Sequence, residues 1–545
     1  MSSSRRMLAA AAAVLALALP LTAVASHGSA DDASPNMLHV ANLPPPAEFL
    51  ACDRGPTCFN SDLAFWGGGG LRGGFTQILA QGNYEGFRLV DISDPANPTQ
   101  ISVLECRGNQ GDVSFYQAKS RLLLIQSIEE PVTTAACATA VDTPVVSGTN
   151  PATLVPSTFR QKGFEGLRIF DVSDPRSPAH IASVNTACGS HTHTTITDAR
   201  NQRAIVYVSS YPSGLRVTRL EDLALPGRNC VPDHNKISIV EIPDADPASA
   251  RVLKEQPLHA DTAVWTGPTG NGGSPVRGCH DITVFDSGSK KVAAGACLEE
   301  GQLWDVSDPA NPTVDVPGRH THIRNFFVNG PTPPFRGLFH TASFTWDGEV
   351  VLFTDEWRGG GAHGCDGPAD TRGNIWFYDN VSPGATAPLR GRYILPRPQP
   401  STETCTQHNG NVIPTNDGYI GVSSAYQAGT TVFDFSDVLS LPPITVPNPS
   451  SVPTAATEVA FYDAKNDPSG PTGVDNAWSS YWHNNYVYVS SGLPSATRPG
   501  ARGLDVYMLL GAKGRLVPAV TDPSAPEVGQ YRARIHRYQN PQTQD

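Results

Sequence analysis

The chain has 545 residues and a formal net charge of −12 at pH 7. Nucleic acids and anionic membranes attract proteins with surplus lysine and arginine, so this balance argues against both as general partners. Hydrophobic residues make up 39% of the chain, enough for a large core, whereas charged residues make up only 17%. Together with 50 glycines and 48 prolines, this composition favours a turn-rich β protein over a helical one.

Residues 1–25 have the pattern of a secretory signal peptide. Arg5 and Arg6 precede a short apolar run from Leu8 to Leu21, and a small-residue cleavage site follows at residues 23–25. The run is too short to span a bilayer comfortably, and no later segment holds about 20 consecutive apolar residues. We therefore expect cleavage and export, which gives a secreted or otherwise extracytoplasmic chain without a transmembrane segment.

Ten cysteines fit an extracytoplasmic compartment, where disulfides persist. No CxxC pair is present, so a zinc ribbon or a thioredoxin-type site is not expected. Pairing the cysteines in chain order would close five compact loops, although sequence alone leaves the connectivity open. The ten are Cys52, Cys58, Cys106, Cys137, Cys188, Cys230, Cys279, Cys297, Cys365 and Cys405.

Three segments repeat one pattern, an apolar strand followed by an acidic residue and an Asp-Pro step. They span residues 86–98, 166–178 and 301–312. We expect the carboxylates of Asp94, Asp174 and Asp308 to fold back onto nearby backbone N–H groups, while the following proline presets a tight turn. Weaker copies lie at residues 236–242, 374–379, 431–437 and 503–508.

A second hairpin precedes each of these strands, as in Val113–Tyr116 with Leu122–Gln126, so every unit contains about four antiparallel strands. Seven such units recur about every 70 residues, a pattern typical of repeat architectures. The predicted fold class is all-β, a seven-bladed β-propeller of four-stranded antiparallel blades over residues 60–525. An open solenoid is the alternative, and it is disfavoured because a closed ring leaves no long sheet edge exposed.

The repeat strands Phe87–Asp91 and Leu167–Asp171 read FRLVD and LRIFD. This signature resembles the LVIVD-repeat family. The resemblance covers roughly residues 60–525 and is specific in the first, second and fourth units. It implies a propeller that is usually extracytoplasmic or at the cell surface, and it implies little about activity.

Two segments are candidates for the strand that closes the ring. Met37–Leu43 stands just before the first unit, where other units carry their outermost strand, and Val528–Ile535 follows the last unit. The sequence does not choose between them. Residues 26–59 are therefore assigned to an N-terminal segment with a candidate closing strand, and residues 526–545 to a C-terminal tail.

Histidines recur at the start of the first strand in five consecutive units. The aligned positions read Asp62, Asp112, His191, His280, His340, His408 and His483. Because the first strand of each blade lines the central channel of a propeller, we expect these imidazoles to converge at one mouth. Neutral imidazoles around one axis suit a transition metal such as Fe, Cu or Zn. His193 lies on the same face as His191, either as a deeper ligand or as part of the core.

The second strand of each blade returns to the same mouth, where Glu129, Glu299 and Glu356 form a column. Carboxylates behind metal-bound imidazoles accept the other ring N–H and fix its tautomer. These three glutamates are therefore candidates to orient the ligands or to act as catalytic acid–base groups. Cys188 and Cys405 each stand three residues before one of the histidines, and an exported chain favours disulfides over mixed Cys–His ligation there.

Four aromatic residues are candidates to wall a pocket above the histidines, with packing between blades as the alternative: Trp357, Tyr426, Trp478 and Trp482. The whole arrangement is similar in outline to carotenoid-cleavage oxygenases, which hold iron with four histidines from separate blades, and to selenium-binding propellers with channel histidines. No extended motif of either group is present, so this similarity is architectural and does not by itself establish function.

The sequence thus predicts one of two functions. The first is an exported propeller with a metal site at the channel mouth, acting as a metal-dependent oxidoreductase or, less favoured, a hydrolase. The second is a non-catalytic extracellular or cell-surface binding module whose histidines are structural or bind an anion when protonated. In both cases we expect a small-molecule, glycan or protein ligand at the mouth, no nucleic acid, and a monomer.

Overall fold

The computed structural model describes residues 32–50 and 59–544, apart from internal gaps. The longer gaps are 133–136, 138–145, 150–155, 160–163, 212–233, 259–277, 314–323, 328–337, 357–372, 445–451, 465–476, 492–501 and 517–522, and the shorter ones are 69–70, 109, 299, 385, 398, 400–402, 417, 514, 536–537 and 541. The predicted signal peptide, Glu299 and Trp357 lie outside the described residues.

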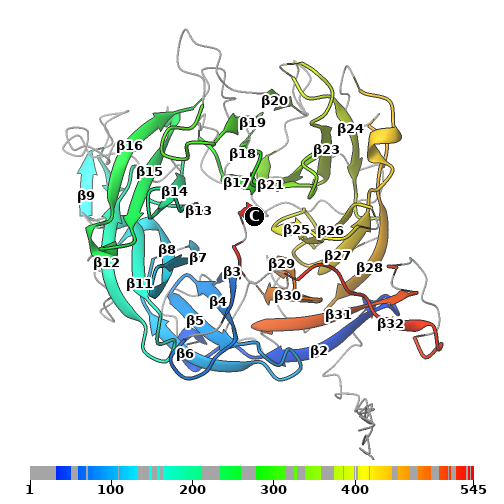
Figure 1. Cartoon of the computed structure of the whole chain (residues 1–545), viewed down its shortest axis with the longest axis horizontal. Helices are drawn as coiled ribbons and strands as arrows, with labels where there is room; N and C mark the ends of the chain where they lie inside the picture. Colours follow the sequence, from blue (N-terminus) through cyan, green and yellow to red (C-terminus); the bar gives the residue numbers. More distant parts are fainter. Residues whose placement is uncertain are drawn as a thin grey trace, which may run out of the picture.

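Seven four-stranded antiparallel blades surround a central channel in the described part of the chain (Figure 1). The first three blades hold β3 (Asn60–Gly67), β4 (Gln77–Asn83), β5 (Gly86–Asp91) and β6 (Thr99–Glu105); β7 (Gln110–Ala118), β8 (Arg121–Val132), β11 (Phe164–Asp171) and β12 (Ala179–Asn185); and β13 (Thr192–Asp198), β14 (Arg203–Ser209), β15 (Lys236–Pro243) and β16 (Arg251–Pro257). A hairpin of β9 (Val146–Thr149) and β10 (Pro156–Phe159) precedes β11.

The next three blades continue the same order, from the innermost strand outward. They hold β17 (Asp281–Asp286), β18 (Lys291–Cys297), β19 (Glu300–Asp305) and β20 (Arg324–Phe327); β21 (Phe339–Phe344), β22 (Val350–Asp355), β23 (Ile375–Asp379) and β24 (Leu389–Tyr393); and β25 (Gly410–Val412), β26 (Ile420–Ser424), β27 (Thr430–Asp434) and β28 (Thr457–Asp463). The short helix α1 (Ala47–Leu50) precedes the first blade. The predicted fold class is confirmed.

The seventh blade joins both ends of the chain. It holds β29 (Ala477–His483), β30 (Tyr486–Ser491) and β31 (Leu504–Ala512), and its outermost strand is β2 (Met37–Leu43). The last three residues of β31 pair instead with β32 (Val528–Gln530). The structure therefore places both candidate closing segments on different stretches of one strand, while β1 (Asp32–Ala33) extends the sixth blade at β28.

The Asp-Pro turns have the predicted hydrogen bonds. In the three strongest repeats the carboxylates of Asp94, Asp174 and Asp308 accept from the backbone N–H two residues further on, at 3.1, 3.2 and 3.1 Å. The acidic residue at the end of the strand makes the same type of turn, as Asp91 does with the N–H of Ser93 at 2.9 Å. Each repeat thus carries the local chemistry that ends one strand and starts the next.

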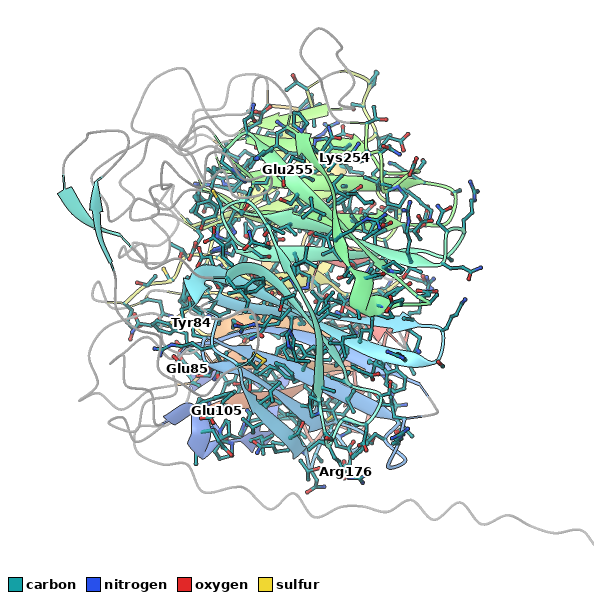
Figure 2. The ribbon with its side chains drawn as sticks, turned by 90° about the vertical axis from the view of Figure 1, so that its left-hand side faces the viewer. Tyr84, Glu85, Glu105, Arg176, Lys254 and Glu255 are labelled. Atoms are coloured by element: carbon teal, nitrogen blue, oxygen red, sulfur yellow. A yellow bond between two sulfur atoms is a disulfide. The ribbon has the colours of Figure 1, made fainter. Side chains whose placement is uncertain are left out.

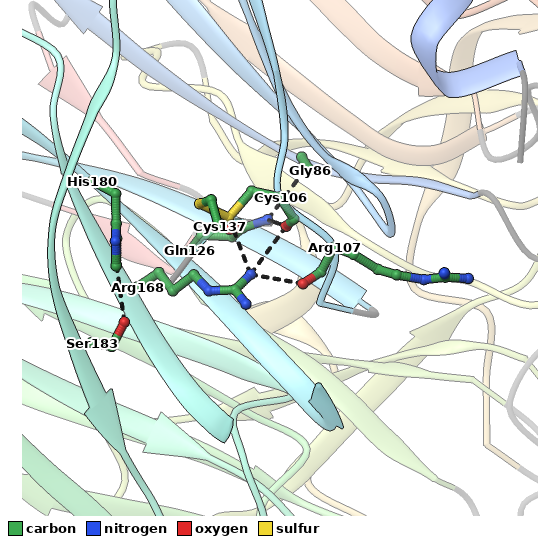
Figure 3. The surroundings of a disulfide bond; sticks show 8 residues. All are labelled: Gly86, Cys106, Arg107, Gln126, Cys137, Arg168, His180 and Ser183. Carbon is green, nitrogen blue, oxygen red and sulfur yellow. Dashed lines mark hydrogen bonds between the residues drawn. A yellow bond between two sulfur atoms is a disulfide. The ribbon is translucent and has the colours of Figure 1, made fainter. Parts of the chain in front are cut away.

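In two of the repeats a buried arginine connects its blade to the chain at the edge of the preceding blade. Arg168 is buried and donates to the carbonyl oxygens of Cys106 and Arg107 at 3.2 and 2.7 Å, beside the Cys106–Cys137 disulfide (Figure 3). Arg88 donates to the carbonyls of residues 43 and 44, at the end of β2. A buried guanidinium needs partners for its N–H groups, so these bonds fix how successive blades pack.

Disulfides follow the chain-order pairing wherever both cysteines are described. The bonds are Cys106–Cys137 and Cys279–Cys297. Cys188 and Cys405 are also disulfide-bonded. The preference for disulfides over mixed Cys–His ligation is therefore confirmed at both positions.

The last residues of the chain enter the channel, and the C-terminus lies at the centre of the ring (Figure 1). We call residues 538–544 the C-terminal plug. Its β33 (Tyr538–Gln539) pairs with β3 and its β34 (Thr543–Gln544) pairs in parallel with β17. The side-chain amide of Asn540 bonds both the N–H and the carbonyl of Phe115, at 2.8 and 2.9 Å, and Gln544 bonds both groups of Phe344, at 2.7 and 2.9 Å.

The plug pairs with the last residues of β3 and β17, in the half of the channel opposite to where the innermost strands begin. We call that beginning the channel mouth. From the plug, Nε2 of Gln542 donates to Oδ2 of Asp62 at 3.3 Å. In the view turned by 90°, Tyr84, Glu85 and Glu105 lie on the side of the mouth (Figure 2). Among the described residues, no helix is long and apolar enough to cross a membrane.

Candidate metal and ligand site at the channel mouth

Four of the five predicted histidines meet at the channel mouth. His191, His280 and His408 stand one or two residues before the innermost strands of the third, fourth and sixth blades. His340 is the second residue of β21, in the fifth blade. They are 6, 3, 2 and 3% exposed, respectively. Neighbouring rings follow one another around the axis, with centroid distances of 4.1 Å for His191–His280, 3.9 Å for His280–His340 and 4.1 Å for His340–His408.

Two glutamates contact this row of imidazoles in different ways. Glu129 lies behind the row, with its Oε1 3.0 Å from Nδ1 of His191. Glu356 instead faces the ring nitrogens, with its carboxylate oxygens 3.6 Å from Nε2 of His340 and 3.7 Å from Nε2 of His408. Glu129 therefore contacts a ring nitrogen of one histidine, whereas Glu356 lies close to the ring nitrogens of two.

One set of donors is close enough to share an ion. The ring nitrogens of His280 and His340 and a carboxylate oxygen of Glu356 lie within 4.8 Å of one another, and all three residues are buried. Nδ1 of His280 and Nδ1 of His340 have no hydrogen-bond partner among the described residues. Nδ1 of His408 donates to the carbonyl of Trp478 at 2.6 Å, which leaves its Nε2 with a free lone pair.

Three of the imidazoles, those of His280, His340 and His408, are held neutral by their surroundings. Burial lowers the pKa of His280 and of His340 well below the ordinary range, and the neighbouring histidines add to the effect. Burial also lowers the pKa of His408, to about 3. Neutral imidazole is the form that ligates metals, and it disfavours the alternative of an anion bound by protonated histidines.

His483 does not join the site, and its predicted alignment was wrong. It is the last residue of β29, next to a two-residue turn in which Asn484 and Asn485 adopt φ of 46° and 74°. Strand β29 begins at the mouth with Ala477 and Trp478, about 17 Å away at the rise of an extended strand. His483 lies instead near the plug, where its Nδ1 is 3.1 Å from Oε1 of Gln539 and its ring stacks on Phe65.

His193 belongs to the core rather than to the mouth. It is fully buried, its two ring nitrogens lie 2.7 and 2.8 Å from the hydroxyls of Ser114 and Ser127, and its Nδ1 lies 3.1 Å from Asp112. Both nitrogens are therefore already paired.

A cavity of about 290 Å³ opens beside the four histidines. Its aromatic wall includes Tyr426 and Trp478, as the sequence suggested, and also Phe59, Tyr84 and Tyr211. Trp482 is not part of this wall, because it packs in the core beside Tyr531. The hydroxyl of Tyr426 donates a short hydrogen bond to Glu356.

Asp62 and Asp112 line the floor of the cavity, whereas the neighbouring buried carboxylate of Asp281 does not line it. Asp62 accepts from Nδ2 of Asn409 at 3.1 Å, and Asp281 accepts from the hydroxyl of Thr192 at 3.1 Å. Burial and the charge of Asp112 raise the pKa of Asp62 to about 7, and burial raises that of Asp281. Asp62 and Asp112 therefore do not occupy the histidine position that the alignment assigned to them.

Several of these residues were missed as site residues. Asn409 and Asp281 each follow a histidine directly in sequence, which is a usable signal for the next layer of the channel. Tyr84 and Tyr211 lie near strand ends at the mouth and carry no such signal. Nothing in the sequence distinguishes them from tyrosines packed between blades.

The comparisons with known proteins address the fold. The family model for the LVIVD repeat matches residues 72–104 and 163–186. No curated protein matches the chain. One similar solved structure is the β-propeller domain of Cps50 (Swd1) from Myceliophteria thermophila, with 10% identity and a TM-score of 0.40; the match covers 83% of this chain and 97% of that one. Another is a protein from Lactobacillus plantarum, with 9% identity and a TM-score of 0.39; that match covers 88% of this chain and 98% of the other.

The similarity to these two structures is too low to support any conclusion about function. The family match coincides with the first two Asp-Pro repeats, whose turns and buried arginines are described above. The chain is therefore a seven-bladed β-propeller that carries LVIVD repeats.

Proposed function

We propose that the channel mouth binds a transition metal ion through His280, His340 and Glu356, with His191 and His408 at its sides. The observation that supports this most strongly is that one ring nitrogen each of His280 and His340 and a carboxylate oxygen of Glu356 lie within 4.8 Å of one another, in three buried residues. Crowding polar groups into a buried site is costly, and an ion shared by the three would offset that cost. A mixed set of imidazole and carboxylate donors suits Fe, Cu or Zn.

The proposal includes export of the mature protein. The disulfides at Cys106–Cys137 and Cys279–Cys297 support it, because such bonds persist mainly in oxidising compartments.

The cavity adds room for a ligand beside the ion. Three protein donors leave an ion with open coordination positions, and such an ion can polarise a bound molecule or activate water. Glu129 would hold the tautomer of His191, and Tyr426 would hold Glu356 through its short hydrogen bond. We therefore propose a metal-dependent enzyme, with oxidative chemistry favoured over hydrolysis.

The second candidate is a non-catalytic binding module in the same exported propeller. The aromatic wall of the cavity favours it, since aromatic side chains line many sites that bind organic molecules. In this function the histidines would fill the mouth without an ion.

Metal analysis of protein made without a His-tag separates the two candidates. The metal proposal predicts near-stoichiometric metal in the wild type, its loss in His340→Ala and Glu356→Gln, and its retention in the control His483→Ala, whose ring lies at the other end of β29. Circular dichroism would verify that all variants fold. A wild type that stays metal-free after incubation with Fe, Cu and Zn salts would leave only the binding module.

A further inference from the structure

We propose that the carboxylate floor of the cavity binds a small organic cation, with an ammonium group between Asp62 and Asp112 and a carbon skeleton against the wall of Phe59, Tyr84 and Trp478. This goes beyond the proposed metal site, because it depends on the other half of the cavity and needs no metal. The bound molecule would place its organic part near the histidines.

The floor has unsatisfied acceptors. Oδ1 of Asp112, Oδ1 of Asn409 and Oγ of Ser61 have no hydrogen-bond partner among the described residues, and these residues are only 2, 5 and 1% exposed. All three line the cavity. An ammonium group offers three N–H donors and no acceptor, so it complements such a set.

No positively charged side chain offsets the acidic residues among the described lining of the cavity. Its acidic lining residues are Asp62, Asp112 and Glu356, and none of the described lining residues is a lysine or an arginine. The raised pKa of Asp62, caused by burial and by the charge of Asp112, is what buried carboxylates show when no cation neutralises them. A positive ligand would supply the missing charge, and an anionic ligand would be repelled.

The wall and the volume favour an organic cation over a bare ion. The rings of Phe59, Tyr84 and Trp478 contact one another, with centroid distances of 5.4, 6.0 and 6.3 Å. Aromatic faces attract cations and cover apolar carbon. The cavity of about 290 Å³ is also far larger than the volume of about 30 Å³ that one water molecule occupies in the liquid.

Calorimetric titration with n-butylammonium tests the proposal, with n-butanol and butyrate as neutral and anionic controls and Ca²⁺ as the inorganic cation. We expect saturable binding of n-butylammonium only. Asp112→Asn should weaken it about tenfold or more, which is at least 1.4 kcal/mol. The matched control Asp198→Asn, which changes a buried carboxylate at the end of β13 away from the mouth, should leave the affinity within about twofold.

A second variant guards against a folding defect in Asp112→Asn. Tyr84→Leu leaves all carboxylates in place and should weaken n-butylammonium binding by removing part of the wall. Absence of n-butylammonium binding, equal binding of n-butanol, or binding of Ca²⁺ that is lost in Asp112→Asn and unaffected by Tyr84→Leu would each overturn the proposal.

The titrations are run on both metal-loaded and chelator-treated protein. If the protein binds n-butylammonium but takes up no metal, only the proposed metal site is refuted. If the protein takes up metal but does not bind n-butylammonium, only the proposed cation site at the floor is refuted.

Discussion

The two ends of the central channel are built from the same innermost strands, yet they differ in how far their buried polar groups have hydrogen-bond partners. At the far end, Asn540 and Gln544 of the C-terminal plug pair with both backbone groups of Phe115 and Phe344. At the mouth, the ring nitrogens of His280 and His340 and the carboxylate of Asp112 keep buried atoms without partners. Both ends are buried, so burial alone does not explain the difference.

This difference distinguishes polar groups that stabilise the fold from polar groups that are available to a ligand. A buried polar group without a partner destabilises the fold, typically by 1–3 kcal/mol, and the plug shows that this chain can satisfy such groups inside its channel. Five buried side chains that line this one cavity have a polar atom without a partner among the described residues: Ser61, Asp112, His280, His340 and Asn409. Such a group of atoms around one cavity indicates a place for a ligand, although unpaired buried atoms also occur elsewhere, as at Oε1 of Gln542 in the plug. We therefore expect the plugged end to contribute mainly to the stability of the fold and the mouth to bind a ligand.

The largest expected effect comes from removing the plug. Deleting residues 538–545 removes five side-chain hydrogen bonds made by Asn540, Thr543 and Gln544, each worth about 1 kcal/mol. The free energy of unfolding should fall by about 5 kcal/mol, measured by urea denaturation. Metal content should stay unchanged. An unaltered urea midpoint would contradict a structural role for the plug.

The next effect concerns pH. Asp62 has a pKa of about 7 in the folded protein, raised chiefly by burial, against 3.8 for an ordinary aspartate. Between these values the folded state holds a proton that the unfolded state has lost, so the stability of the ligand-free protein falls as pH rises from about 4 to about 7.

Asp62→Asn should remove this part of the pH dependence. The difference between wild type and variant should change across that range by on the order of a few kcal/mol, as followed by denaturation at a series of pH values. Parallel profiles for the two proteins would show that Asp62 does not titrate in this way.

A smaller effect is expected from one side chain of the plug. Asn540→Ala leaves the N–H and the carbonyl of Phe115 without partners, which should cost about 2 kcal/mol. Asn540→Asp buries a carboxylate whose second oxygen faces the carbonyl of Phe115, so its loss should be at least as large at neutral pH and smaller in acid, where the protonated group can donate. Losses in the two variants that are equal at every pH, again in urea, would mean that packing rather than hydrogen bonding matters at this position.

The fold was predictable because the residues of each repeat determine its local structure. An apolar strand, an acidic residue and an Asp-Pro step specify a strand and a turn locally, and the hydrogen bonds of Asp94, Asp174 and Asp308 follow from these residues alone. The convergence of four histidines followed from the same register, because strands at equal places in the repeat reach the axis at equal depth.

The failures have equally specific causes. His483 was misplaced because the adjacent Asn484-Asn485 pair was not recognised as the turn of a two-residue hairpin, a sequence signal that was available. The plug was not foreseen, because Asn540 and Gln544 recognise backbone groups of distant strands and such contacts leave no periodic pattern. Asp62 and Asp112 were predicted at the mouth, and both do line the cavity. They were aligned with the histidines, however, and their role as the floor was not foreseen.

Anomalous diffraction from crystals grown with the metal found in the purified protein tests the central claim most directly. The account predicts one strong peak bonded to ring nitrogens of His280 and His340 and to Glu356, at metal–ligand distances of about 2.0–2.2 Å. No peak at the mouth in metal-saturated crystals, or peaks only at partly exposed histidines such as His39 and His180, would contradict it.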